Sequence, residues 1–287
     1  MPYLNKRGEY WYICKNTVES GKHKHKTLKA LGKISDEEAK SKLEEWGVGY
    51  GKQRVLIEAK MDTLRAFKRS GIPYDVWDFK DRGEGGDKNF HGNTSPKVAT
   101  QLLLMLTNIG GYVIDPMCGS GTVIDVCKRL GRICTAFDLN PVRHDCIEHD
   151  ATKDWDLVEA QADLIFIHPP YWNLVVYGKK RNDLSTAATL GDFFRLLRDI
   201  FTNAYTNLKP GGYIAVQQGD VVQNGQFLPL CTKTFQVLEE CKFYPHHEII
   251  KIAHGEVSRK KSGMLVAEYV YQEQWKISHD RILVFRK

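Results

Sequence analysis

The feature that most limits the possible folds of this chain is a glycine-containing turn, DPMCGSGT, at residues 115–122. A short apolar run precedes this turn, and a segment with helical character begins at Thr122. Glycine lets the backbone approach a ligand closely, and the first turn of a helix carries amide groups without intrahelical partners. Dinucleotide and phosphate sites use similar turns, but the chain has neither G-x-G-x-x-G nor G-K-[S/T] here, which disfavours both.

Strands and helices alternate from about residue 90 to the end of the chain. We expect helices over residues 97–107, 122–130, 190–208 and 228–240. We expect strands over residues 111–114, 133–137, 164–167, 213–217, 265–271 and 281–286. This alternation predicts an α/β fold with an open, mostly parallel sheet, an antiparallel terminal strand and helices on both faces. Ligands of such sheets bind at the carboxyl ends of the strands.

Polar residues stand at two further places that this architecture brings to the same sheet edge. Asp138 ends the strand that follows the glycine-containing turn, where a carboxylate can accept hydrogen bonds from both hydroxyls of a ribose. Upstream, Thr94 and Ser95 precede the helix expected from residue 97. They either contact a ligand or cap that helix.

The segment HPPYW, residues 168–172, follows the apolar strand expected at residues 164–167. Pro169 and Pro170 restrict the backbone to a rigid turn. A neutral imidazole at His168 has one acceptor nitrogen, and it titrates near neutral pH. The alternative for His168 is a structural histidine whose ring is satisfied by its neighbours.

Together these segments resemble the S-adenosylmethionine-dependent amino-methyltransferases that modify adenine N6 or cytosine N4 in DNA. Residues 115–122 resemble motif I (DPFxGSGT), residues 90–97 resemble motif X, and the HPPYW segment resembles motif IV ([D/N/S]PPY). The resemblance covers about residues 75–287. It implies a Rossmann-like methyltransferase fold, S-adenosyl-L-methionine as cofactor and no metal.

The resemblance also implies a cofactor site. Asp138 would bind the ribose, Asp150 the adenine ring, and Thr94 and Ser95 the methionine end. The complete expected set is Asp115, Pro116, Met117, Cys118, Gly119, Gly121, Asp138, Asp150, Thr94 and Ser95.

The same resemblance implies that catalysis is mainly positioning. His168 and the carbonyl of Pro169 would accept hydrogen bonds from the target amine, after the turn set by Pro170. Tyr171 would stack on a base flipped out of double-stranded DNA, and Trp172 would form a wall of the pocket. Because the family has Asp, Asn or Ser where this chain has His168, the target base stays open, with adenine favoured as the commoner target.

The first 33 residues carry a charge of +6, from eight Lys and Arg against two Glu, so the rest of the chain is neutral overall. Strands expected over residues 9–14 and 24–31, followed by a helix over about residues 35–46, resemble the arm-type DNA-binding modules of phage integrases and some transposases. By this resemblance Lys22, Lys24, Lys26 and Lys29 would contact phosphates. A solubilising charged face is the alternative.

These patterns divide the chain into three parts. Residues 1–50 form a small basic β/α nucleic-acid-binding module, residues 51–88 a helical connector with a helix over about residues 54–69, and residues 89–287 the methyltransferase domain. The loop after residue 172 is either a plain surface loop or a lid over nucleic acid, contacted through Lys179, Lys180 and Arg181. Asp220, after the strand at residues 213–217, is a further candidate to line the pocket.

The cysteines and the apolar runs indicate the compartment. Seven cysteines without a C-x-x-C pair or zinc-ligand spacing predict reduced thiols. No apolar run reaches the length of a membrane span, and the amino end lacks a signal-peptide pattern. We therefore expect a cytoplasmic protein without membrane contact; the candidate assembly is a homodimer.

The motif order X, I, IV leaves no long insertion for a target-recognition domain. This favours a solitary DNA modification enzyme, associated with a restriction system or a mobile element. An RNA amino-methyltransferase would share motifs I and IV, and a non-catalytic DNA-binding protein would keep the cofactor pocket after loss of the motif IV acid. A dehydrogenase is disfavoured by the HPPYW segment.

Overall fold

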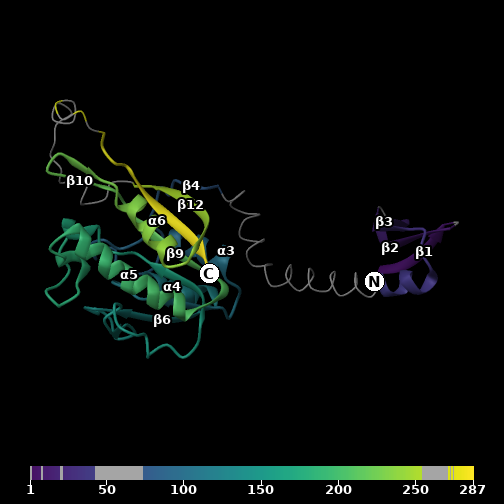
Figure 1. The fold of residues 1–287 in the computed structure, drawn as a ribbon, viewed down its shortest axis with the longest axis horizontal. Helices are drawn as coiled ribbons and strands as arrows, with labels where there is room; N and C mark the ends of the chain where they lie inside the picture. Colours follow the sequence, from purple (N-terminus) through teal and green to yellow (C-terminus); the bar gives the residue numbers. More distant parts are fainter. Residues whose placement is uncertain are drawn as a thin grey trace. The chain divides into compact units, whose positions relative to one another are not determined.

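The computed structural model describes residues 2–7, 9–19, 22–42, 74–253 and 275–287, together with Tyr271 and Glu273. The chain divides into two compact units, Met1–Ala66 and Phe67–Lys287 (Figure 1). The expected helix over residues 54–69 lies outside the described residues, as does the expected strand over residues 265–271 apart from Tyr271.

The first unit contains a three-stranded antiparallel sheet of β1 (Pro2–Arg7), β2 (Tyr10–Glu19) and β3 (Lys22–Gly32). A helix begins at residue 36. Ser35 caps it, because the Glu38 amide donates to Ser35 Oγ (3.1 Å) and the Ser35 amide donates to Glu38 Oε2 (3.1 Å). β1 was not predicted, because its sequence PYLNKR lacks the alternation of apolar residues typical of a strand.

The second unit is built on an eight-stranded sheet in the order β4-β12-β13-β9-β8-β5-β6-β7. Its strands are β4 (Val76–Trp77), β5 (Tyr112–Asp115), β6 (Ile133–Asp138), β7 (Ile147–Glu148), β8 (Ala162–Ile167), β9 (Leu208–Gln218), β12 (Tyr244–Ile252) and β13 (His279–Arg286). Every pairing is parallel except those of β13 with β12 and with β9. The α/β, Rossmann-like fold and its antiparallel terminal strand are confirmed.

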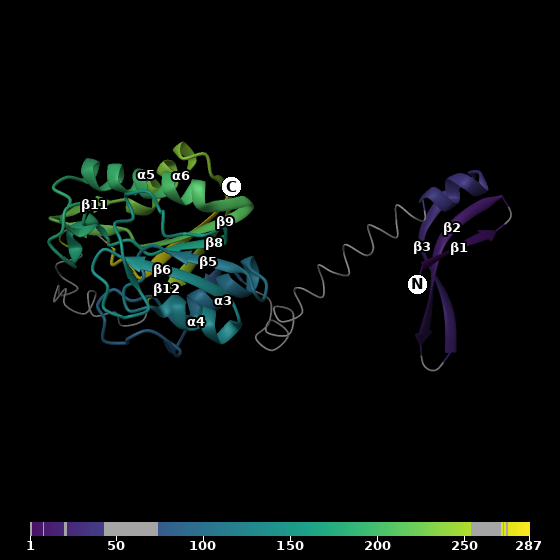
Figure 2. The ribbon, with the colours of Figure 1, turned by 90° about the horizontal axis from the view of Figure 1, so that it is seen from below.

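Helices from the described part of the second unit cover both faces of this sheet (Figure 2). They are α3 (Pro96–Leu106) and α4 (Thr122–Leu130) on one face, and α5 (Leu190–Asn207) and α6 (Leu230–Glu240) on the other. β8 lies between the layers and is buried on both sides: Leu164 and Phe166 pack with α3 and α4, whereas Ile165 and Ile167 pack with α5 and α6. Successive side chains of a strand point to opposite faces, so a continuous apolar run is what this position requires.

The connections place the functional edge. The chain leaves β5 through α4 towards β6, whereas it leaves β8 through α5 towards β9 on the other side of the sheet. The carboxyl ends of the neighbouring strands β5 and β8 therefore form a topological switch point, where open α/β sheets bind their ligands. Both the glycine-containing turn and the HPPYW segment begin there.

Three features of this unit differ from the predicted elements. β12 was not predicted, because its polar start YPHH hides the apolar residues Ile249, Ile250 and Ile252. The hairpin of β10 (Val221–Gln223) and β11 (Gln226–Leu228) was also missed. Residues 74–88, expected in the connector, belong to the second unit, where β4 pairs with β12. Within the described ranges, no helix combines the length and apolar character that crossing a bilayer requires.

Candidate active site

A cavity of about 700 Å³ lies at the carboxyl ends of β5, β6, β8 and β9. It brings together site residues that the sequence places far apart. Those that line it are Thr94, Asp115, Pro116, Met117, Cys118, Gly119, Asp138, Asp150, His168, Pro169, Pro170 and Tyr171. Ser95, Gly121, Trp172, Lys179, Lys180 and Arg181 are not among the lining residues.

Glycines shape the turn between β5 and α4. Gly119 and Gly121 both have positive φ, 46° and 76°. A Cβ on Gly121 would lie 2.7 Å from the Arg143 side chain, and a Cβ on Gly119 would lie 3.0 Å from the ring of Phe90. Gly121 is the N-cap residue of α4, so its contribution is conformation and close packing rather than contact with the cavity.

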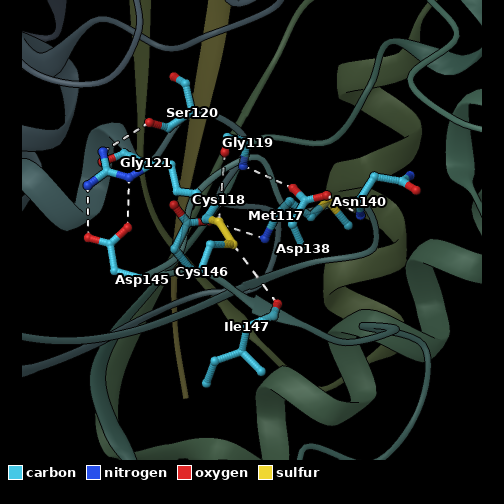
Figure 3. The surroundings of a disulfide bond; sticks show 12 residues. Met117, Cys118, Gly119, Ser120, Gly121, Asp138, Asn140, Asp145, Cys146 and Ile147 are labelled. Atoms are coloured by element: carbon cyan, nitrogen blue, oxygen red, sulfur yellow. Dashed lines mark hydrogen bonds and ion pairs between the residues drawn. A yellow bond between two sulfur atoms is a disulfide. The ribbon is translucent and has the colours of Figure 1, made fainter.

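Asp138 joins the glycine-containing turn to the end of β6. Its Oδ2 accepts a hydrogen bond from the Gly119 amide (2.9 Å), and its Oδ1 accepts one from the Asn140 amide (2.8 Å), as Figure 3 shows. A carboxylate oxygen has more than one lone pair, so both oxygens retain capacity to accept hydrogen bonds from a ligand. This geometry suits the recognition of a pair of hydroxyl groups.

Asp115 ends β5 and is only 3% exposed. Burial raises the pKa of its carboxyl group to about 8; a hydrogen bond from the Met117 amide opposes this, and the charge of Asp138 adds to it. Asp115 therefore holds a proton over much of the range in which an ordinary Asp is ionised. A cation bound in the cavity would favour its ionised form.

Two buried polar atoms of the lining residues, Ser120 Oγ and Asp183 Oδ2, have no hydrogen-bond partner within the described part of the chain. An unsatisfied buried polar atom costs roughly 1–3 kcal/mol, which a ligand that pairs with it would offset. Ser120 and Asp183 were missed as site residues. Ser120 stood inside the glycine-containing turn, but Asp183 had no local signal because it arrives from the loop after the HPPYW segment.

Thr94 and Ser95 have different roles, although they are adjacent. Thr94 Oγ1 donates to Gln217 Oε1 (2.5 Å) beside the cavity. Ser95 Oγ accepts from the Lys97 amide (3.2 Å) and donates to the Arg82 carbonyl (2.8 Å), so it caps α3. Of the two roles that the sequence allowed, Ser95 therefore has that of the helix cap.

Asp150 lines the cavity with its carboxylate already hydrogen-bonded. Oδ1 accepts from the Thr152 amide (2.9 Å) and hydroxyl (2.7 Å), and Oδ2 accepts from Asn182 Nδ2 (2.9 Å). Burial raises the pKa of Asp150, but the hydrogen bonds from Thr152 and Asn182 outweigh it and leave the pKa below its usual value. Asp150 therefore stays ionised and ties the loop after the HPPYW segment to the end of β7.

In the HPPYW segment, His168 Nε2 lies 3.4 Å from Tyr171 Oη, and the two rings meet edge to face. Trp172 has a positive φ of 51°, and its indole Nε1 donates to the Ala187 carbonyl (2.9 Å). Trp172 thus anchors the turn from behind, against the core, instead of forming a wall of the cavity as expected.

The loop that follows covers the cavity through an aromatic residue. The ring of Tyr177 stacks on Phe90 with centroids 6.3 Å apart, and burial, with the charges of Asp138 and Asp183, raises its pKa to about 12. Lys179, Lys180 and Arg181 are exposed beyond it. Lys180 pairs with Glu148 and donates to the Leu139 carbonyl (2.7 Å), so this lysine fastens the loop to the neighbouring strand ends.

Of two acids near the end of β9, the one expected to line the cavity does not line it, and the other, which was not predicted, does. Asp220 was expected to line the pocket, but its Oδ1 accepts from the Cys231 amide (2.8 Å) at the start of α6, and Asp220 is not a lining residue. Asp280, from β13, lines the cavity together with Gln217 and was missed. No local pattern marks Asp280, because it reaches the site only through the pairing of β13 with β9.

The expectation that all cysteines are reduced is wrong for one pair. Cys118, in the glycine-containing turn, forms a disulfide with Cys146 (Figure 3). The other five cysteines are free thiols. The two bonded cysteines are 28 positions apart, so no spacing motif revealed them. Arg143 fastens the same segment to the turn, since its Nη1 donates to the Ser120 carbonyl (3.1 Å) and its guanidinium pairs with Asp125 and Asp145.

Comparison with known proteins gives the family. The model of the N6/N4 methyltransferase family, described as DNA methylase, matches residues 2–149, just over half of the chain. This span contains the glycine-containing turn and Asp138, and it ends before the HPPYW segment. A search of the curated proteins found no match.

Several solved structures are similar to the chain. TrmN from Thermus thermophilus is 19% identical with a TM-score of 0.43, over 67% of this chain and 49% of TrmN. TTHA0409, also from Thermus thermophilus and complexed with S-adenosyl-L-methionine, is 22% identical with a TM-score of 0.33, over 48% of this chain and 53% of TTHA0409. A TehB-like SAM-dependent methyltransferase from Corynebacterium glutamicum is 14% identical with a TM-score of 0.41, over 82% and 99%. The chain thus spans about half the length of TrmN and of TTHA0409.

The raised pKa of Asp115 predicts a pH dependence of stability. Between about pH 4 and pH 8 the folded protein holds a proton that the unfolded chain has released, so the free energy of unfolding falls as the pH rises through this range. The slope from this group is at most about 1.4 kcal/mol per pH unit, and it ends above the folded pKa. Urea unfolding at several pH values should show this fall in the free energy of unfolding in the wild type, and Asp115→Asn should lack the contribution of Asp115 to it. Equal slopes in the two proteins would contradict the assignment.

The disulfide predicts a redox-dependent stability. Closing a loop between residues 28 positions apart stabilises the folded state by about 3.5 kcal/mol, so Cys146→Ser should lower the free energy of unfolding by roughly that amount without reductant. Dithiothreitol should lower the stability of the wild type towards that of Cys146→Ser and leave the variant unchanged. Cys241→Ser, which removes a free thiol, is the matched control. Alkylation of all seven cysteines in unreduced, denatured protein would disprove the bond.

Proposed function

Because this chain belongs to the DNA methylase family, we propose that it methylates an exocyclic amine of a base in double-stranded DNA, adenine N6 or cytosine N4, with adenine the first candidate. In this proposal the chain is a methyltransferase, and S-adenosylmethionine is its cofactor. The proposal of an amine target rests on one observation: a single cavity joins the glycine-containing turn and Asp138 to His168 and Tyr171.

The residues of the cavity fit the cofactor. S-adenosylmethionine carries a sulfonium and an ammonium charge, and carboxyl groups of Asp115, Asp138, Asp150 and Asp183 surround the cavity. Asp138 would hold the ribose and Thr94 the methionine end, while Ser120 Oγ and Asp183 Oδ2 offer polar atoms without protein partners. When bound, S-adenosylmethionine supplies a methyl group bonded to a positively charged sulfur, which accepts the electron pair of the broken S–C bond.

The HPPYW segment orients the amine. A neutral His168 and the carbonyl of Pro169 each accept one N–H of an exocyclic amine, which leaves the nitrogen lone pair directed at the methyl group. The ring of Tyr171 offers a face for a base that has left the helix. The amine proton that is lost passes to the acceptor nitrogen of His168 and then to water.

The first unit supplies affinity for DNA in this proposal. The four lysines assigned to phosphate contact, Lys22, Lys24, Lys26 and Lys29, all lie on β3, the longest strand of its sheet. A sheet-and-helix module with a charge of +6 in its first 33 residues suits an arm-type contact with the DNA backbone. The exposed Lys179 and Arg181 would extend this contact beside the cavity.

Two variants separate cofactor binding from turnover. Asp138→Ala should weaken S-adenosylmethionine binding about 100-fold or more, because it removes charged hydrogen-bond acceptors, whereas His168→Ala should leave binding within about twofold and lower kcat about 100-fold. Calorimetry measures the first effect. Transfer of tritiated methyl to unmethylated genomic DNA measures the second, and nucleoside mass spectrometry identifies the base. Asp156→Ala, at an exposed acid, is the control.

The outcomes distinguish the alternatives. Equal loss of cofactor binding in Asp138→Ala and His168→Ala would contradict the roles assigned here. Methylation of total RNA but not of DNA would make the enzyme an RNA amino-methyltransferase. Cofactor binding without methyl transfer to either nucleic acid would identify a non-catalytic DNA-binding protein.

The role of the first unit predicts a change in salt dependence. Replacing the four β3 lysines by Gln should weaken duplex DNA binding and reduce the slope of log Kd against log salt concentration by up to about 3.6, because each phosphate contact releases about 0.9 counterion. Fluorescence anisotropy at several salt concentrations measures this.

The matched control for this variant changes the same charge elsewhere, at Lys80, Lys153, Lys233 and Lys242, which are exposed in the second unit. It should leave the slope nearly unchanged. An equal loss of slope in both variants would mean that overall charge, rather than the β3 lysines, determines binding.

A further inference from the structure

The strand β13 brings an acid to the site from the end of the chain. β13 runs antiparallel to β9, so its first residues lie beside the carboxyl end of β9, where Arg281 pairs with Gln218. Asp280, the second residue of β13, is 1% exposed and lines the same cavity as His168 and Tyr171. An acidic side chain thus reaches the functional edge of the sheet from outside every segment that resembles a methyltransferase motif.

Gly219 has no side chain, and this leaves room for Asp280 and the HPPYW segment to approach each other. A Cβ on Gly219 would lie 3.0 Å from Asp280 Oδ1 and 2.7 Å from Tyr171 Cε2, so both groups approach the same point. The hydroxyl of Tyr171 lies 3.4 Å from His168 Nε2. Tyr171 thus has the His168 imidazole at its hydroxyl, and its ring and the Asp280 carboxylate both border Gly219.

A buried chain of polar side chains holds Asp280 in place. Its Oδ2 accepts from Gln217 Nε2 (3.2 Å) and pairs with Lys251 Nζ (3.4 Å), and Gln217 in turn accepts from Thr94. All four side chains belong to residues that are at most 8% exposed. The chain links the segment assigned to the methionine end of the cofactor with the place assigned to the target amine.

Burial of an ion pair costs desolvation energy, and replacing such a pair by apolar residues is often neutral or stabilising. Lys251 and Asp280 join β12 to β13. The net stability that this ion pair adds to the fold is therefore too small to explain its presence by a structural role alone. A carboxylate that faces a cavity stabilises positive charge that develops there, because preorganised charges act strongly where water is excluded.

We propose that Asp280 is a catalytic residue that supplies the carboxylate for the target amine, in place of the acid absent from position 168; this rests on the proposed function. As the nitrogen bonds to the methyl carbon, the S–C electron pair stays on sulfur and the nitrogen becomes positive until it loses one proton through His168. Asp280 stabilises that positive charge electrostatically, while the two N–H groups stay hydrogen-bonded to His168 and to the Pro169 carbonyl.

The test uses Asp280→Asn in the full-length protein. It should lower kcat for methyl transfer to unmethylated genomic DNA by about 100-fold to 1000-fold and leave the Kd of S-adenosylmethionine within about twofold. Asp220→Asn, which changes an acid near the same sheet edge that is turned to α6, should keep wild-type kcat. A kcat for Asp280→Asn within threefold of the wild type would overturn the proposal.

A second variant separates catalysis from the structural ion pair. Asp280→Asn combined with Lys251→Met removes both charges, so no buried lysine charge is left facing the neutral Asn side chain. The double variant should fold with a Tm near that of the wild type and remain as inactive as Asp280→Asn. Recovery of wild-type kcat would show that the pair is structural only. A wild-type protein that binds cofactor but methylates no DNA would overturn the proposed function, and this inference with it.

Discussion

The parallel pairing of β5 with β8 is the contact on which the rest of the site depends. Val113 and Ile114 pair with Leu164 and Ile165, and this places the ends of two distant segments side by side. The chain leaves β5 and β8 in opposite directions along the sheet, so no helix closes the space between their carboxyl ends. The cavity lies there, and the apolar burial of β8 on both faces stabilises the pairing that opens it.

Around that pairing, the structure holds its ligand-facing backbone by several independent contacts. Asp138 accepts from the Gly119 amide, Arg143 fastens the Ser120 carbonyl, and the Cys118–Cys146 disulfide joins the turn to the same segment. A glycine-containing turn whose backbone contacts the ligand has few side chains of its own that could hold it rigid. Here neighbouring segments supply the rigidity, which keeps the positions of the donors fixed before a ligand arrives.

Sequence reasoning predicted the parts of the site that have a local pattern. The glycine-containing turn, Asp138 and the HPPYW segment each follow an apolar strand, and strand ends of a parallel sheet share one edge. Ser95 and Trp172 were assigned to the pocket but serve the helix cap and the core, because a sequence pattern states that a side chain is near the site and not where it points. The reduced state expected of Cys118 and Cys146 was wrong, because their proximity depends on two chain reversals.

The sequence by itself determined the α/β class, the α3 to α6 helices and most strands, since these depend on periodicity and caps within a few residues. It also determined the family, through motifs of contiguous residues. Only the tertiary structure decided that β13 enters the sheet between β12 and β9, and that Gln217 and Lys251 meet Asp280 at the end of β9. These contacts join residues from 29 to 63 positions apart, and no local pattern encodes such pairs.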